Sequence, residues 1–114
     1  MELILNQKFY NEKGENLKDG ATMGVFLSSI ISQSQGNNDI RKFWNWATIL
    51  GSNEVLNIDK PDFDKLFTFV ENSQHPNMIF LTKGQLLETL IFQRDNQSKV
   101  KELIKKQELS NESK

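Results

Sequence analysis

The chain has 114 residues and carries 14 basic against 15 acidic side chains, so its formal net charge is −1. Its 37% hydrophobic and 25% charged residues are typical of one folded domain, which excludes a disordered chain or two separate cores. The absence of cysteine excludes disulfides, thiolate metal sites and cysteine nucleophiles. A balanced charge also gives no general affinity for nucleic acid or anionic lipid.

The N-terminus has neither the basic start nor the apolar run of a signal peptide. No later run is long enough for a membrane span. We therefore expect a cytoplasmic protein that contacts no membrane.

The first residues predict a small β element. Leu3 and Leu5 alternate with their neighbours in a segment that ends at Phe9, and a turn containing Gly14 follows. A second short segment, residues 15–17, completes a predicted β-hairpin. Because an isolated hairpin is marginal in water, it is expected to lie against helices.

Two helices follow. Thr22 is a candidate N-cap, and the spacing of the apolar residues after it predicts an amphipathic helix from Met23 to about Ser32. Asp39 suits the N-terminus of a second helix, which Gly51 ends. The predicted buried face of this second helix is Ile40, Phe43, Ala47 and Leu50.

A short segment from Glu54 to Ile58 is rich in branched residues and could add a strand. Asp59 then caps a third helix that has Pro61 in its first turn, where a missing N–H costs nothing. The buried stripe of this helix is predicted to be Phe63, Leu66, Phe67 and Val70.

Residues 78–92 allow two interpretations. A helix that begins near Pro76 competes with a strand over 78–81 followed by a capping box at 82–85. The spacing of the apolar residues favours one helix, in which Gly84 would allow a close helix crossing at a cost of about 1 kcal/mol in helix propensity.

These elements predict a mainly helical α+β fold of about four helices with a small N-terminal β-hairpin. Residues 1–94 form the expected globular domain, and 95–106 form an amphipathic basic helix. Residues 107–114 carry nothing to bury and are expected to be a disordered tail.

The two tryptophans are the most informative residues. Residues two apart on a helix point about 200° from each other, so Trp44 and Trp46 cannot share one buried stripe. At least one indole is therefore expected to be half exposed, beside Arg41 and Lys42. This mixture predicts a binding surface made of Arg41, Lys42, Trp44 and Trp46. The alternative is that Phe43 and one Trp are core residues and the two cations only face water.

A second basic patch consists of Lys99, Lys101, Lys105 and Lys106. It is either a solvated face or a weak nucleic-acid surface. The ridge of Val100, Leu103 and Ile104 could dock on a second subunit, and we expect a homodimer.

The sequence offers no catalytic set. His75, the one histidine, precedes Pro76 in a polar turn and is expected to be a solvated turn residue. The acids at Asp59, Asp62 and Asp64 lack the spacing and the glycine of a calcium loop. The scattered glycines form no phosphate loop. We therefore expect no enzyme, no catalytic residue, no bound metal and no cofactor.

The chain combines a strand and glycine turn (9–15), a Gly-x-Thr-x-Gly helix start (20–24) and a Trp-Ala helix (46–47). An Asp-rich cap before an aromatic helix (59–66) and a Gln-Leu-Leu-Glu helix (85–88) follow. In these features, over about 94 residues, it resembles small, largely uncharacterised proteins of tailed phages and prophages of low-GC bacteria. The resemblance implies a place in the cytoplasm of the host cell and carries over no functional residue.

We therefore expect a non-enzymatic phage or prophage accessory protein of the anti-defence type. It would sequester or inhibit a host factor, a defence protein or a nucleotide signal. Its partner would be a host or phage protein or a small anionic ligand. The alternatives are a nucleic-acid-binding regulator, which the net charge disfavours, and a virion-assembly chaperone.

Overall fold

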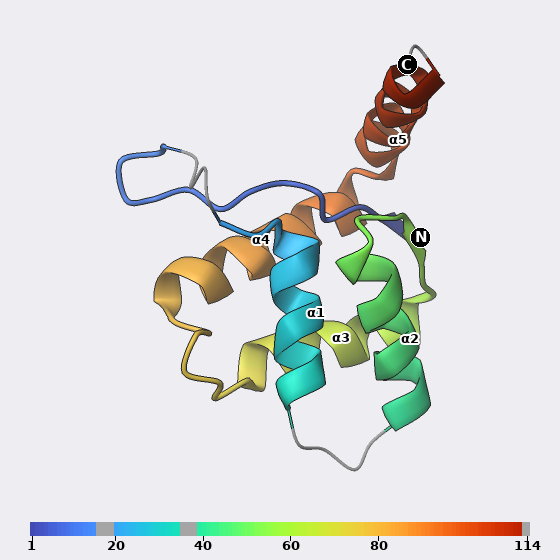
Figure 1. The fold of residues 1–114 in the computed structure, drawn as a ribbon. Helices are drawn as coiled ribbons and strands as arrows, with labels where there is room; N and C mark the ends of the chain where they lie inside the picture. The colour runs from blue at the N-terminus through green and yellow to red at the C-terminus, as the bar shows by residue number, and fades with distance from the viewer. Residues whose placement is uncertain (16–19, 35–38, 113–114) are drawn as a thin grey trace.

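The computed structural model describes residues 1–15, 20–34 and 39–112, with side chains described as far as residue 108. In these ranges the chain forms five helices and a two-stranded antiparallel sheet, so the predicted mainly helical α+β class is confirmed (Figure 1). In chain order the elements are β1 (Glu2–Leu3), α1 (Met23–Gln33), α2 (Ile40–Gly51), β2 (Leu56–Asn57), α3 (Lys60–Asn72), α4 (Phe80–Asp95) and α5 (Gln97–Glu112).

Helices α1 and α2 lie side by side and form the closest helix pair of the fold (Figure 1). Thr22 caps α1 as predicted, because its hydroxyl accepts a hydrogen bond from the backbone N–H of Val25 at 3.2 Å. Gly24 allows the close approach: a Cβ built on it would lie 2.5 Å from the carbonyl oxygen of Leu50 and 2.8 Å from that of Leu5. Any side chain at this position would push α1 away from both neighbours.

Helix α3 begins as the sequence predicts. The Asp59 carboxylate accepts a hydrogen bond from the N–H of Asp62 at 2.9 Å, and Pro61 lies in the first turn. Three residues of the predicted stripe, Phe63, Leu66 and Val70, are buried, whereas Phe67 is only partly covered.

The partner of β1 differs from the predicted hairpin. Its register pairs Glu2 with Asn57 and Leu3 with Leu56, so β1 pairs with β2, the strand that the segment 54–58 suggested. The turn at Gly14 is present, with a positive φ of 80°. Residues 16 and 17 of the expected second strand lie outside the described residues. Pairing with β2 lets the N-terminal arm reach the centre of the molecule, where its leucines are buried.

Glutamine side chains hold the other edge of the N-terminal arm (residues 1–10). The amide of Gln93 accepts a hydrogen bond from the N–H of Ile4 at 2.9 Å and donates one to its carbonyl at 2.8 Å. Gln97 pairs in the same way with the backbone of Glu2 at 2.7 and 2.9 Å. Gln85 does so with that of Tyr10 at 2.9 and 2.8 Å. These three pairs attach the arm to α4 and α5, and we refer to them as the glutamine clasps.

Helix α4 resolves the ambiguity of the region 78–92 in favour of the helix, which begins at Phe80 rather than near Pro76. The role predicted for Gly84 is wrong, because a Cβ at this position would meet nothing within 4 Å. Gly24 makes the close helix approach instead.

Helix α5 begins two residues after the start predicted for the basic helix and runs to Glu112. It therefore includes residues 107–112 of the expected tail, while 113 and 114 lie outside the described residues. The helix projects from the rest of the molecule (Figure 1), and the side-chain amide of Asn6 donates a hydrogen bond to Gln107 in its C-terminal half at 3.1 Å. No helix in the described part of the chain is both long enough and apolar enough to span a membrane.

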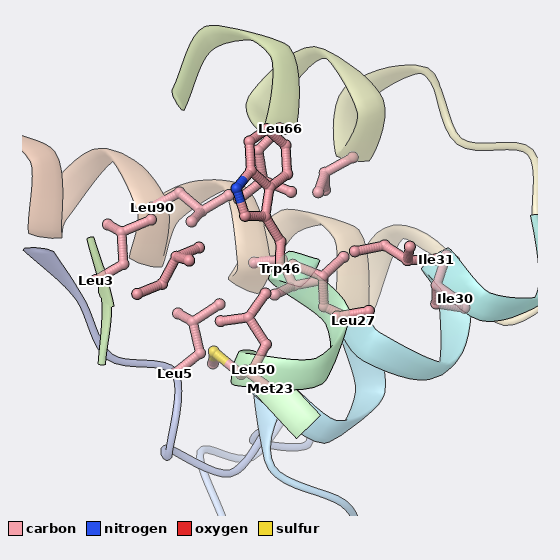
Figure 2. Close-up of a cluster of buried hydrophobic side chains, with 14 of the residues drawn as sticks. Leu3, Leu5, Met23, Leu27, Ile30, Ile31, Trp46, Leu50, Leu66 and Leu90 are labelled. Atoms are coloured by element: carbon pink, nitrogen blue, oxygen red, sulfur yellow. The ribbon is translucent and has the colours of Figure 1, made fainter. Parts of the chain in front are cut away.

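The core lies between the N-terminal arm and helices α1 to α4. Figure 2 shows the indole of Trp46 pointing toward α3, where Leu66 lies. The face predicted for α2 is partly wrong: Trp46 is buried, whereas Ile40 is 66% exposed. Ile40 is the first residue of the helix and lies beyond the edge of the core. The buried residues of α2 are Trp46, Ala47 and Leu50, so its buried face is rotated from the predicted one toward Trp46.

Candidate functional site

An open groove of about 1490 Å³ lies where the C-terminal end of α1, the N-terminal half of α2 and the C-terminal half of α3 meet. The side chains that line it differ in character. Its apolar residues are Ile31, Ile40, Phe43, Trp44 and Phe69. Its polar residues include Gln33, Asp39, Asp64, Lys65, Thr68 and His75. The groove therefore offers an apolar surface beside many polar groups, and binding sites combine these two kinds of surface.

A chain of aromatic rings connects the groove to the core. Phe43 packs edge-on against the buried Trp46, with ring centroids 4.8 Å apart. On its other side Phe43 contacts Phe69 of α3, with centroids 5.2 Å apart. The groove wall is therefore fixed to the core by ring contacts of the geometry that aromatic pairs favour.

Trp44 stands at the edge of this wall. It follows Phe43 by one residue, a rotation of about 100° on the helix, which turns it away from the core. Trp44 is 63% exposed, whereas Trp46 is 4% exposed. The prediction that at least one indole is half exposed is thus confirmed. An exposed indole on a rigid helix is a common anchor in protein interfaces.

An ion pair connects α3 to the start of α2 at the groove. The ammonium of Lys65 lies 2.8 Å from a carboxylate oxygen of Asp39. The hydrogen bond from Lys65, with its positive charge, holds the pKa of Asp39 below its ordinary value of 3.8. Asp39 has a left-handed backbone with φ 46°, which Asp tolerates better than most residues, and its carboxylate does not cap α2. The side chain instead holds Lys65, so both charges at this point are already paired.

His75 ties the connection between α3 and α4 to the end of α1. Its Nε2 lies 2.6 Å from Oε1 of Gln33, and its Nδ1 accepts a hydrogen bond from the backbone N–H of Asn77 at 3.1 Å. Because Nδ1 accepts, Nε2 carries the proton in the neutral ring and donates it to Gln33. His75 is therefore a partly covered turn residue that closes one end of the groove.

The four residues of the predicted binding surface do not come together. Trp44 lines the groove, and Trp46 lies in the core. The ammonium of Lys42 lies 2.9 Å from Asp62 of α3, and this hydrogen bond raises the pKa of Lys42. Arg41 is exposed and makes no ion pair with any residue that the structure describes. Of these four, Trp44 is the one that the groove presents.

The lysines of α5 do not form one patch. At 100° per residue, Lys101 and Lys105 project from one side of the helix, and Lys99 and Lys106 project from the opposite side. The ammonium of Lys99 lies over the ring of Phe92, 5.7 Å from its centroid. Val100 between them is buried, and Leu103 is half exposed. The ridge that was expected to join a second subunit is therefore partly used within the chain.

The acids near the start of α3 have structural roles. Asp59 caps the helix and Asp62 pairs with Lys42. Within the described ranges, no three His, Asp or Glu side chains come together as potential metal ligands.

Sequence reasoning found Trp44 but missed the rest of the groove. Gln33 and Thr68 are ordinary polar residues in helices, and Lys65 has no local pattern that distinguishes it. Phe69 gave the one available signal, because it lies beside the buried stripe of α3. Comparison of the chain with protein families, curated proteins and solved structures found no match.

Proposed function

We propose that this chain is a non-enzymatic binding protein that holds a segment of a partner protein in the groove between α1, α2 and α3. The observation that carries the proposal is Trp44, which is 63% exposed at the edge of the groove although its helix is anchored by the buried Trp46 and the partly buried Phe43. A rigid, exposed indole at the edge of a groove supplies contact area with little loss of conformational entropy on binding.

The charges at the groove favour a protein partner over a small anionic ligand. Lys65 is paired with Asp39, and Asp64 adds a further negative charge to the lining. An anion or a nucleotide signal would need unpaired cations at the binding surface. An apolar side chain of a partner, flanked by polar or basic groups, fits this lining better.

In the phage setting that the sequence resembles, such a partner is a host factor or a defence protein, which the bound chain sequesters or inhibits. A nucleic-acid-binding role has less support, because the α5 lysines lie on opposite sides of the helix and the net charge is −1. Arg41, three residues before Trp44 on the same side of α2, supplies a charged contact at the edge of the partner.

The test is capture of partners from the lysate of a low-GC bacterial host, with wild type, Trp44→Ala and Phe92→Ala compared at equal concentration. Phe92 is a matched control because it is a half-exposed aromatic residue on α4 that does not line the groove. Trp44→Ala is expected to weaken binding of the captured protein by about 1 to 2 kcal/mol, and Phe92→Ala by much less.

Two further measurements make this result decisive. Thermal unfolding of both variants should match wild type, because neither side chain belongs to the buried core. Arg41→Glu should weaken binding of the captured protein, because Arg41 supplies a charged contact to acidic groups at the edge of the partner, and it should leave the fold intact. If Trp44→Ala and Phe92→Ala retain the same partner with equal affinity, the groove is not the binding site.

A further inference from the structure

Among the described residues, the most exposed large apolar side chain is Phe80, which does not line the groove. Phe80, the first residue of α4, is 95% exposed, and Ile79 before it is 56% exposed. Scattered apolar residues are normal on a protein surface, but two adjacent ones on a projecting turn are a typical interaction site. We call Ile79 and Phe80 the apolar tip.

The apolar tip is rigid and close to the groove. The N–H of Met78 bonds to the carbonyl of His75 at 2.9 Å, and Met78 is buried. The hydroxyl of Thr82 bonds to the carbonyl of Asn77 at 2.9 Å and lies 3.2 Å from that of Ile79. His75 itself lines the groove. The tip and the groove are therefore joined by one short, hydrogen-bonded turn.

We propose that two copies of this chain form a two-fold dimer in which the apolar tip of each copy inserts into the groove of the other. The inference rests on the assignment of the groove as a binding site made above. A two-fold contact requires that a surface contain both halves of each interaction, and the neighbouring tip and groove meet this requirement. The second copy also covers the apolar side chains that one copy leaves in water.

The exposed area agrees with a stable dimer. Ile40 and Trp44 at the groove, with Ile79 and Phe80 at the tip, expose on the order of 1,000 Å² in two copies together. An interface of about 1,600 Å², of which roughly 60% is apolar, has a similar apolar area. The ridge of Val100, Leu103 and Ile104, first expected to form the dimer, exposes less apolar area, because Val100 is fully buried.

The charges are also compatible with insertion. Lys83, three residues after Phe80, donates hydrogen bonds to the carbonyls of Glu71 and Ser73, at 3.1 and 2.9 Å, within its own chain. The tip itself carries no charge. The tip therefore brings no charge into the contact, and Lys65 and Asp39 of the groove are already paired with each other.

The first test is sedimentation of the wild-type chain, Phe80→Ser and Leu103→Ser from low to high micromolar concentration. Phe80→Ser is expected to raise the dimer dissociation constant at least ~30-fold, the effect of losing a strong interface anchor. Leu103→Ser, a half-exposed control on α5, should leave it within about threefold, as expected of a residue outside the contact. The fold of Phe80→Ser should be intact because Phe80 has almost no contact area within its chain.

The second test uses the absence of cysteine in the natural chain. Thr68→Cys places a thiol in the groove and Asn77→Cys places one beside the tip, at two exposed positions. Mixing the two single variants with a short bifunctional thiol reagent should give a cross-linked heterodimer in higher yield than either variant alone. Iodide quenching of Trp44 should fall as the wild-type concentration rises, since Trp46 is already buried.

A wild-type chain that stays monomeric at high micromolar concentration would overturn the proposal and leave the groove to a different protein. A dimer that Phe80→Ser leaves unchanged, or open assemblies larger than two, would also overturn it. These outcomes are distinct from failure of the proposed function, because self-association is measured without any host protein and a captured partner takes the place of the second copy in the groove.

Discussion

Replacing Gln93 with leucine should cost about 2 to 4 kcal/mol of the free energy of unfolding. Gln93 is 1% exposed, and its amide satisfies both the N–H and the carbonyl of Ile4. Leucine has a similar size and helix propensity, so neither packing volume nor local helix stability changes much. The two backbone groups of Ile4 would remain buried without partners, at about 1 to 3 kcal/mol each, offset in part by removal of the buried amide.

The other glutamine clasps supply matched controls. Gln85 makes the same pair of bonds to Tyr10, but in water, so Gln85→Leu should cost less than about 1 kcal/mol because solvent replaces the lost bonds. Gln97→Leu should fall between the two, since its bonds to Glu2 are partly buried. The loss in the free energy of unfolding is thus expected to depend on how deeply the backbone groups are buried and not on how many hydrogen bonds are removed.

Urea unfolding of the three variants and wild type measures these differences, and amide hydrogen exchange at Ile4 provides a local readout. Gln93→Leu should lose protection at Ile4 before the global unfolding transition. Equal losses for Gln93→Leu and Gln85→Leu, or a wild-type stability for Gln93→Leu, would refute the reasoning.

Three further substitutions test two helical glycines and the ion pair at the groove. Gly24→Ala should destabilise the fold by about 1 to 3 kcal/mol, because its Cβ would overlap two backbone oxygens, whereas Gly84→Ala should stabilise it by about 0.5 to 1 kcal/mol. Thermal unfolding checks both, and a stabilising Gly24→Ala would contradict the packing of α1 on α2. Lys65→Met should return the pKa of Asp39 toward 3.8 in an NMR titration. Since the folded pKa is lowered, the stability contributed by this pair is present at neutral pH and is lost as the pH falls through the pKa of Asp39. An unchanged pKa in Lys65→Met would disprove the ion pair.

The sequence alone predicted those features that depend on neighbouring residues. Helix caps are local, so Thr22 and Asp59 could be identified from the residues that follow them. The angle of about 200° between Trp44 and Trp46 on the helix makes their side chains point to different sides, independently of how the helix packs. The α+β class followed from the periodicity of the apolar residues in the same way.

Tertiary structure decided the features that depend on residues far apart in the chain. Which indole is buried depends on how α2 is rotated against α3, and no local pattern sets that rotation. The partner of β1 is more than fifty residues away, and a nearby glycine turn suggested a different strand. Gly24 and Gly84 are both glycines in helices, but only the packing of α1 on α2 makes the first one necessary.

The candidate site shows the same division. The sequence could identify an exposed tryptophan, because exposure on one side of a helix is a local consequence of geometry. It could not assemble the groove, because its contacts join separate segments and form only in the folded chain. Gln33 is hydrogen-bonded to His75, and Lys65 forms an ion pair with Asp39. Gln93 is a polar residue, yet the fold buries it to satisfy the backbone N–H and carbonyl of Ile4.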